Sequence, residues 1–192
     1  MDIYQKKLIL ASKSPRRKQL LTESGFDFVI KTKDIDESYP AGLTPAETAE
    51  YIAAKKAEAC RSFLADYPEK IILTADTIVV LHGKIYGKPK NRADAVRILN
   101  ELAGKTHRVI TGVCLLSRGK KKCFHGISQV TFGALNAEEI DYYIDTCRPF
   151  DKAGAYGVQE WLGHCKITDI SGTYANIMGL PTDLVYEELR KF

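Results

Sequence analysis

The sequence predicts an α/β protein built on one mixed sheet. Helix and strand patterns interleave along the chain, which is typical of α/β folds. The middle of the chain is a meander of strands without helical crossovers, which argues for a mixed sheet and against a doubly wound parallel one. Composition does not shift between the two halves, and no linker rich in Gly, Pro or Ser separates them. Residues 1–192 are therefore expected to form a single domain.

The N-terminal third predicts a strand, a helix, a strand and a longer helix. Residues 8–11 are an apolar run that suits a short buried strand. Ser14 can cap a helix that has Pro15 in its first turn and Gly25 as its stop signal. A second strand is predicted over 28–32. Residues 33–43 are polar and irregular.

The next helix begins at a capping box, the segment Thr44-Pro45-Ala46-Glu47. It is rich in alanine and is expected to reach about Leu64. Two apolar runs follow, over 71–75 and 78–81, and Thr74-Ala75-Asp76-Thr77 joins them. We expect strands for both runs.

The middle of the chain predicts one helix and one long hairpin. His82-Gly83 suits a turn that leads to Ile85-Tyr86. Asn91 and Asp94 begin a helix that Gly104 ends. The hairpin strands are predicted over two ranges, 108–116 and 123–132.

The C-terminal part predicts two helices separated by a loop. Asn136 begins the first helix, and Pro181 opens the second. Residues 149–159 form a loop. Weaker strand patterns cover 158–162 and 166–170.

Composition and charge exclude several functional classes. The chain is 45% hydrophobic and 27% charged, with a net charge of +4, so it is neither disordered nor strongly basic. Its one basic cluster, Arg118 with Lys120, Lys121 and Lys122, separates two strand patterns and suits an exposed turn rather than a nucleic-acid surface. No apolar run approaches the roughly 20 residues of a membrane span. We expect a cytoplasmic protein that binds neither membrane nor nucleic acid, and whose mild positive charge suits a small anionic ligand.

The cysteines and histidines give no recognisable site. The five cysteines are odd in number and lack C-x-x-C spacing, so neither a disulfide framework nor a zinc site is expected. Free cysteines are usually small buried hydrophobes, in keeping with a reducing cytoplasm. The four histidines are scattered, and turn or surface positions are expected for them. No P-loop, G-x-G-x-x-G or H-E-x-x-H pattern is present.

Three segments carry residues that suit a polyanion. The first, Ser12-Lys13-Ser14-Pro15-Arg16-Arg17, puts two arginines at a helix N-terminus, where they oppose the helix dipole and where phosphate binds well. An ordinary Ser-Pro cap with solvated arginines is an equal alternative.

The second segment has Asp76 between two apolar runs, and Gly87-Lys88-Pro89 follows it. A carboxylate there can hold Mg²⁺ or orient a water molecule, and it can also be an ordinary turn residue.

The third segment is the glycine-containing loop over 151–159, which ends at Gln159. Its glycines allow close backbone approach, and the Gln side chain can read the edge of a base. A purely structural loop is the simpler alternative for this segment alone. Glu37 and Lys56 are weaker candidates, since a lone Glu or Lys is usually solvated surface.

Taken in order, these segments resemble the Maf family of nucleoside triphosphate pyrophosphatases over nearly the whole chain. The resemblance includes Asp36-Glu37, Ala54-Lys55-Lys56-Ala57, Ala75-Asp76-Thr77 and Met178-Gly179-Leu180-Pro181 besides the three segments above. It implies a fold like that of inosine-triphosphate pyrophosphatases, an elongated mixed sheet with flanking helices and a cleft between two lobes. It also implies hydrolysis between the α- and β-phosphates and a divalent metal cation, Mg²⁺ or Mn²⁺.

The resemblance also assigns roles to individual residues. Asp76 would be the catalytic proton acceptor, and Glu37 would join it in holding the metal. Arg16, Thr77 and Gln159 would set substrate specificity. Phosphate binding would fall to Ser12, Arg17, Lys56 and Lys88.

The loop Asp-Lys-Ala-Gly-Ala-Tyr-Gly-Val-Gln resembles the family branch that acts on dTTP and UTP. It departs from that branch at Val158, where Ile is common, and in the following Glu160-Trp161. The alternatives are a 7-methyl-GTP pyrophosphatase, an enzyme that removes non-standard nucleotides, and a nucleotide-binding regulator of septum formation. Homodimerisation stays open at this point.

Overall fold

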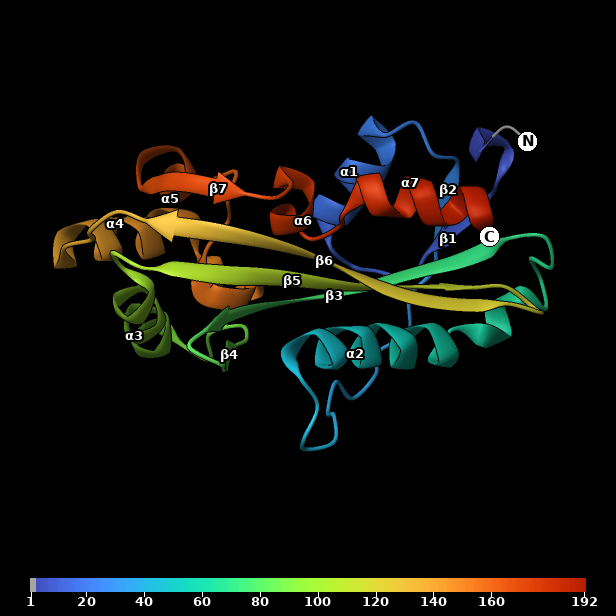
Figure 1. Cartoon of the computed structure of the whole chain (residues 1–192), viewed down its shortest axis with the longest axis horizontal. Helices are drawn as coiled ribbons and strands as arrows, with labels where there is room; N and C mark the ends of the chain where they lie inside the picture. Colours follow the sequence, from blue (N-terminus) through green and yellow to red (C-terminus); the bar gives the residue numbers. More distant parts are fainter. Residues whose placement is uncertain (1–2) are drawn as a thin grey trace. The chain divides into compact units, whose positions relative to one another are not determined.

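The computed structural model describes residues 3–192 and contains a seven-stranded mixed sheet with flanking helices (Figure 1). The strand order is β2-β1-β3-β5-β6-β7, and β4 pairs with β3. β1 is parallel to both of its neighbours, whereas the β3–β4 and β6–β7 pairs are antiparallel. The strands are β1 (Leu8–Leu10), β2 (Phe28–Ile30), β3 (Ile71–Leu81), β4 (Lys84–Tyr86), β5 (Thr106–Leu116), β6 (Lys121–Phe132) and β7 (Ile167–Ser171).

The helices begin where the capping signals predict. Ser14, Thr44, Asn91 and Asn136 each accept a hydrogen bond from a backbone N–H of the first turn that follows. The α-helices are α1 (Pro15–Glu23), α2 (Pro45–Ala59), α3 (Arg92–Leu102), α4 (Ala137–Cys147), α5 (Trp161–Cys165), α6 (Tyr174–Met178) and α7 (Thr182–Lys191). Four 3₁₀ helices complete the described chain: η1 (Ile3–Gln5), η2 (Arg61–Leu64), η3 (Pro149–Asp151) and η4 (Ala153–Ala155).

The chain divides into two compact units. Unit 1 contains the described part of Met1–Asp76 together with Thr111–Gly126 and Gly179–Phe192. Unit 2 contains Thr77–Ile110 and Ile127–Met178. Each unit takes its residues from separate stretches of chain, because β3, β5 and β6 each contribute to both.

In unit 1, α2 packs on one face of the strands, and α1 and α7 lie on the other (Figure 1). The contact face of α2 carries Ala49, Ala53 and Ala57, spaced four residues apart and all fully buried. Small side chains at this spacing let the helix backbone lie directly on the sheet. A Cβ atom added at Gly112 of β5 would lie only 2.3 Å from the backbone carbon of Ala49. The glycine is therefore required by the close approach of α2.

In unit 2, α3 lies against both α4 and η4. An aromatic cluster of His107, Phe132 and Tyr156 packs edge to face, with ring centroids 4.8 to 5.4 Å apart. A hydrogen bond of 2.8 Å joins His107 Nε2 to the Tyr156 hydroxyl. Burial lowers the pKa of His107 to about 4, so the ring is neutral at neutral pH. The expectation of a turn or surface position is wrong for His107.

Three local predictions are wrong, and one short helix was not predicted. The two apolar runs around Asp76 form one continuous strand, β3, and α2 ends at Ala59 with the separate η2 following it. The strand predicted over 158–162 is absent: α5 begins at Trp161 and the residues before it are loop. The short helix α6 had no recognisable signal in the sequence. The predicted strand over 166–170 is confirmed as β7.

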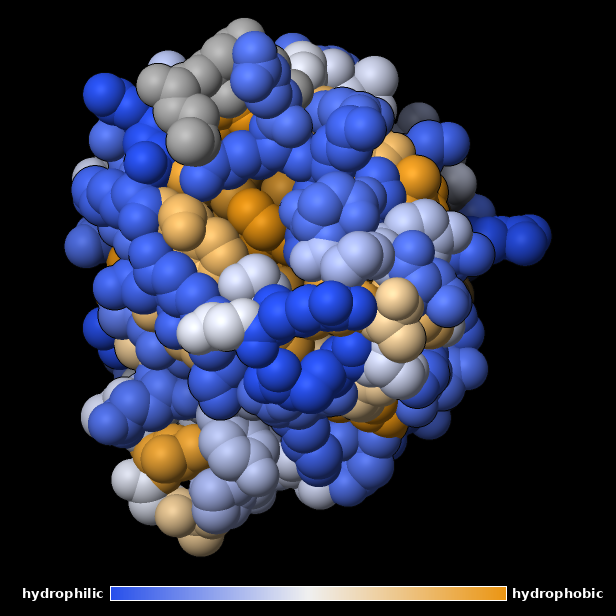
Figure 2. Space-filling view, turned by 90° about the vertical axis from the view of Figure 1, so that its right-hand side faces the viewer, coloured by the Kyte–Doolittle hydropathy of each residue, from blue (hydrophilic) through white to orange (hydrophobic). Residues whose placement is uncertain are grey.

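The predicted exposed turn at the basic cluster is confirmed for Arg118 and Lys120. Arg118 and Lys120 are exposed in the turn between β5 and β6, and the Lys120 ammonium donates to the carbonyl of Lys191 at 2.7 Å. Figure 2 shows a mostly hydrophilic surface with small, separated hydrophobic areas on the face that it presents. Within residues 3–192, no helix has the length and apolarity needed to cross a bilayer.

Candidate active site

Asp76 lies near the middle of β3, in a stretch that neither β1 nor β4 pairs with. The β1 ladder ends at the pair Leu10–Leu73, and the β4 ladder begins at Val79–Tyr86. Asp76 is half-buried there. It is thus a carboxylate within a strand rather than a turn residue, and an ionised group at such a position needs a partner.

The partner of Asp76 is Lys56, which α2 delivers to this stretch of β3. The Thr74 hydroxyl donates to the carbonyl oxygen of Ala53 at 2.6 Å and ties the helix to the strand. Side chains alternate along a strand, so Asp76 shares the α2-facing side of β3 with Thr74. Lys56 Nζ lies 2.7 Å from Asp76 Oδ1, and the two side chains are only 16% and 13% exposed.

The same ammonium group also binds Glu37. Lys56 Nζ lies 2.7 Å from Glu37 Oε1. The segment around Glu37 is held by the preceding lysine of α2, because Lys55 Nζ donates to the Ser38 carbonyl at 3.0 Å and reaches Asp36 at 3.4 Å. Consecutive lysines on one helix therefore position the glutamate next to the aspartate.

Arg17 comes from the first turn of α1, where Ser14 Oγ caps its backbone N–H. Its Nε donates to the carbonyl oxygen of Gly179 at 2.8 Å, and its Nη1 donates to Ser12 Oγ at 3.4 Å. The first and last segments of the family pattern thus meet within unit 1. The pKa of the Arg17 guanidinium lies below its ordinary value, mainly because the group is buried. The negative charges of Asp76 and Glu37 raise this pKa, and the positive charge of Arg16 lowers it. The charges of these groups therefore act on one another directly.

The cluster in unit 1 suits a polyanion and a hard cation. The N-terminal end of α1 carries partial positive charge, and Arg16, Arg17 and Lys56 add full charges beside it. Two carboxylates already share one cation, the Lys56 ammonium. Mg²⁺ typically binds through one or two carboxylates and completes its shell with water and phosphate oxygens. The described residues form no group of three or more His, Cys, Asp or Glu that could hold a metal alone. Glu37 and Asp76 therefore fit a metal that arrives with a phosphate ligand.

The other predicted site residues belong to unit 2. Thr77 follows Asp76 in β3 and points to the opposite face of the strand, as does Val79. The loop over 151–159 packs at Val79: an added Cβ at Gly154 would lie 2.7 Å from a Val79 methyl, and Gly154 has a φ of +70°. The Gly154 N–H donates to the carbonyl of Gly87 at 3.1 Å, so this loop is joined to the turn that carries the exposed Lys88.

A buried polar network that the sequence did not reveal anchors the same loop. Lys152 is 7% exposed and binds Asp151 at 2.8 Å and Glu160 at 2.9 Å. Glu160 also accepts a hydrogen bond from the hydroxyl of Tyr143 on α4. The oxygen of that hydroxyl accepts a hydrogen bond from the Gly157 N–H at 3.0 Å. Burial raises the pKa of Tyr143, as does its bond to Glu160. Two signals in the sequence could have indicated this network, namely Asp151 and Lys152 at the start of the loop and the departure from the family pattern at Glu160-Trp161, but none indicated Tyr143.

Gln159 lies between Gly157 and Glu160, the two loop residues that Tyr143 holds. Its side-chain oxygen Oε1 is buried and accepts no hydrogen bond from any described residue. An unsatisfied buried polar atom costs about 1–3 kcal/mol. A ligand with an N–H or O–H donor would satisfy it.

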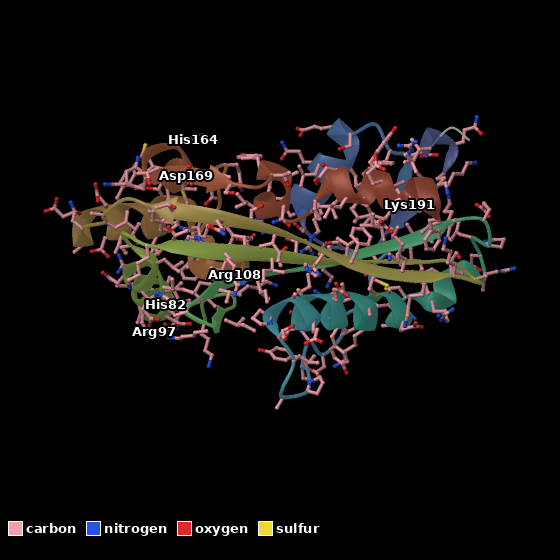
Figure 3. The ribbon with its side chains drawn as sticks, viewed as in Figure 1. His82, Arg97, Arg108, His164, Asp169 and Lys191 are labelled. Carbon is pink, nitrogen blue, oxygen red and sulfur yellow. The ribbon has the colours of Figure 1, made fainter. Side chains whose placement is uncertain are left out.

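The histidines form no catalytic arrangement with one another. His82 is exposed in the turn between β3 and β4, and His164 is exposed on α5 (Figure 3). His164 Nε2 bonds the carbonyl of Gln159 at 3.2 Å. In unit 1, His125 pairs with Glu50 at 2.5 Å. The contacts of the described histidines therefore include no Ser-His-Asp triad.

Comparison with known proteins identifies a family. A family model described as "Maf-like protein" matches residues 7–192. A dTTP/UTP pyrophosphatase of Bacteroides thetaiotaomicron is 52% identical over 192 residues, which is 100% of this chain and 97% of the relative. A dTTP/UTP pyrophosphatase of Porphyromonas gingivalis is 48% identical over 194 residues, with 100% and 96% coverage.

Among solved structures, the Staphylococcus aureus Ham1 protein aligns with a TM-score of 0.57 and 17% identity. The alignment covers 97% of this chain and 99% of that one. At this identity the similarity concerns the fold alone. Together with the seven-stranded mixed sheet and its flanking helices, it confirms the predicted fold class.

Proposed function

The chain belongs to the Maf family, and from that premise we propose that it is a pyrophosphatase of dTTP and UTP. Water attacks the α-phosphorus, the bond to the bridging oxygen of the β-phosphate breaks, and the products are a nucleoside monophosphate and pyrophosphate. The observation that carries the proposal is the ion-paired cluster in which Lys56 Nζ lies 2.7 Å from both Glu37 and Asp76, beside Arg17. The names of the relatives at 48–52% identity support the choice of substrates.

The residues divide between phosphate binding and proton transfer. Ser12, Arg17, Lys56 and Lys88 bind the triphosphate, with Arg16 adding charge at the end of α1. Phosphoryl transfer depends mainly on positioning and charge neutralisation, which this set of cations supplies. Asp76 accepts the proton of the attacking water at a carboxylate oxygen.

A divalent cation, Mg²⁺ or Mn²⁺, forms part of the proposal. Glu37 and Asp76 would hold it, since their carboxylates already face a common cation. When bound, such an ion neutralises phosphate charge and lowers the pKa of water. Homodimerisation and a cytoplasmic location stay predictions.

The first prediction concerns the products. With dTTP or UTP and Mg²⁺, we expect the monophosphate and pyrophosphate to appear in equal amounts. Orthophosphate should be detected only after an inorganic pyrophosphatase is added to the quenched reaction. Direct release of orthophosphate would place cleavage at the γ-phosphate and contradict the proposal. We also expect 7-methyl-GTP to be a poor substrate, and a kcat/KM equal to that for dTTP would contradict the choice of branch.

The second prediction concerns Gln159 as the reader of the base. The amide can accept from N3–H and donate to O4 of thymine or uracil, and its buried Oε1 lacks a partner among the described residues. Gln159→Ala should therefore bring the kcat/KM values for UTP and CTP closer together, because a site that hydrogen-bonds its substrate rejects mismatched analogues.

Gln129, exposed on β6 of the same unit, provides the matched control. Gln129→Ala should keep the wild-type UTP/CTP ratio. An unchanged ratio in Gln159→Ala, with the protein folded and active, would remove Gln159 from base recognition.

A further inference from the structure

The β5–β6 hairpin places two of the cysteines directly opposite one another. The Ser117 N–H donates to the Lys120 carbonyl at 2.8 Å, next to the turn. Counting three residues back from Ser117 and three forward from Lys120 reaches Cys114 and Cys123. The far end of the hairpin keeps the same register, because the Phe132 N–H donates to the Lys105 carbonyl at 3.0 Å. Cys114 and Cys123 are thus cross-strand partners.

The pair occupies the closer type of cross-strand position. Antiparallel partners alternate between hydrogen-bonded pairs and non-hydrogen-bonded pairs, whose Cα atoms approach to about 4.5 Å. Ser117 and Lys120 are a hydrogen-bonded pair, so three steps along the ladder Cys114 and Cys123 are a non-hydrogen-bonded one. Disulfides form across Cα separations of about 4.4–6.8 Å. The backbone therefore already has the spacing that a disulfide needs.

Both thiols point to the same face of the hairpin. Cys114 is fully buried in a core cluster with Ala53 and Ala57 of α2, and Cys123 packs against that cluster while keeping part of its surface exposed. The Cys114 thiol donates to the Leu115 carbonyl at 3.9 Å. The adjacent Cys123 raises the pKa of Cys114, which burial raises further, and Cys114 in turn lowers the pKa of Cys123. Cys123 is therefore the thiol that an oxidant reaches first.

We propose that Cys114 and Cys123 are a modification site at which a peroxide forms an intramolecular disulfide. The Cys123 thiolate attacks hydrogen peroxide and the O–O bond breaks, which gives a sulfenic acid and hydroxide. The hydroxide takes up the proton that the Cys123 thiol released and leaves as water. The Cys114 thiol then attacks the Cys123 sulfur, the S–O bond breaks, and a second water leaves with the Cys114 proton. The two thiols lose two electrons in total and the peroxide gains them. A dithiol reductant reverses the bond by exchange.

The pairing has a second consequence for Cys123. A sulfenic acid without a neighbouring thiol is oxidised further to the irreversible sulfinic acid. Because Cys114 lies directly opposite, it intercepts the sulfenic acid before that step. Cys114 thus acts as the resolving thiol, and its removal should change the oxidation product of Cys123.

The test is peptide mapping of the full-length protein after treatment with hydrogen peroxide and alkylation of the remaining thiols. Trypsin cleaves after Arg118, so Cys114 and Cys123 fall in different peptides that only a disulfide can join. The peptide that begins at Cys123 also contains Cys147, so the experiment is repeated in Cys147→Ser. We expect the same linked peptides in both proteins, and their loss after treatment with dithiothreitol.

Single-cysteine variants test separately whether Cys123 reacts first with the peroxide and whether Cys114 is the resolving thiol. In Cys123→Ser, Cys114 should stay reduced, because it is buried and has lost the thiol that reacts first. In Cys114→Ala, Cys123 should gain two oxygen atoms as sulfinic acid. Exposed Cys165 reports in every sample that the oxidant was active. Melting curves check that both variants fold, and if Cys114→Ala does not, the wild-type and Cys123→Ser results still decide.

Three results would overturn the proposal: sulfinic acid at Cys123 in the wild type, a linkage of Cys123 to Cys60 in the same core cluster, or an unreacted pair while Cys165 is oxidised. None of these measurements depends on turnover. Failure of this proposal is therefore distinguishable from failure of the proposed activity.

Discussion

Asp76→Asn is expected to lower kcat for dTTP by about 10²–10⁴-fold or more, with the fold intact. Loss of a general base alone accounts for a decrease of this size. Asn keeps the shape of the side chain, but it does not accept a proton at neutral pH and is a weaker metal ligand. It also removes one of the two carboxylates that Lys56 binds at 2.7 Å. Nucleotide binding should weaken less than turnover, since Arg16, Arg17, Lys56 and Lys88 remain.

The measurement is kcat with saturating dTTP and metal, with circular dichroism and melting temperature as checks on folding. Asp169 provides a matched control, because it is also a carboxylate within a strand but is exposed on β7 (Figure 3). Asp169→Asn should leave kcat near the wild-type value. A folded Asp76→Asn protein that keeps more than about a tenth of wild-type kcat falls well short of the loss of a general base, and Asp76 would then not be the proton acceptor.

Gly112→Ala is expected to be the most destabilising small substitution in unit 1. The new Cβ would lie 2.3 to 2.5 Å from the backbone of α2 at Ala49 and Glu50. Overpacking in a core costs about 1–3 kcal/mol, occasionally more. We expect at least the upper value here, because a helix backbone has no rotamer with which to move aside. For a chain of this size, about 3 kcal/mol lowers the melting temperature by roughly 6–12 °C.

Gly119→Ala is the control, since Gly119 lies in the turn of the same hairpin and an added Cβ there has no atom within 4 Å. Its free energy of unfolding should change by no more than about 0.5 kcal/mol. Pyrophosphatase activity should fall with Gly112→Ala as well, because α2 carries Lys56. Equal melting temperatures for the two variants would show that α2 can shift away from β5 at little energetic expense.

Where an element begins could be predicted closely from the sequence. Ser14, Thr44, Asn91 and Asn136 each cap a helix as expected, because capping is a contact between residues two or three apart in the chain. The strand predicted over 158–162 was wrong because contacts between segments far apart in the chain decide the structure there. Its residues belong to a loop and helix held by Lys152, Glu160 and Tyr143, and Tyr143 lies on a different helix. Contacts between distant segments override local pattern there.

The sequence by itself determined the family, the mixed α/β class and which residue types serve a triphosphate, because those follow from the order of motifs and from side-chain chemistry. Only the tertiary structure decided that Lys56 joins Glu37 to Asp76, that Arg17 bonds Gly179, and that Cys114 faces Cys123. The first two depend on how closely α2 and α1 approach the strands, which buried alanines and Gly112 permit for α2. The third depends on strand register, since a shift of one residue would send one thiol to the other face.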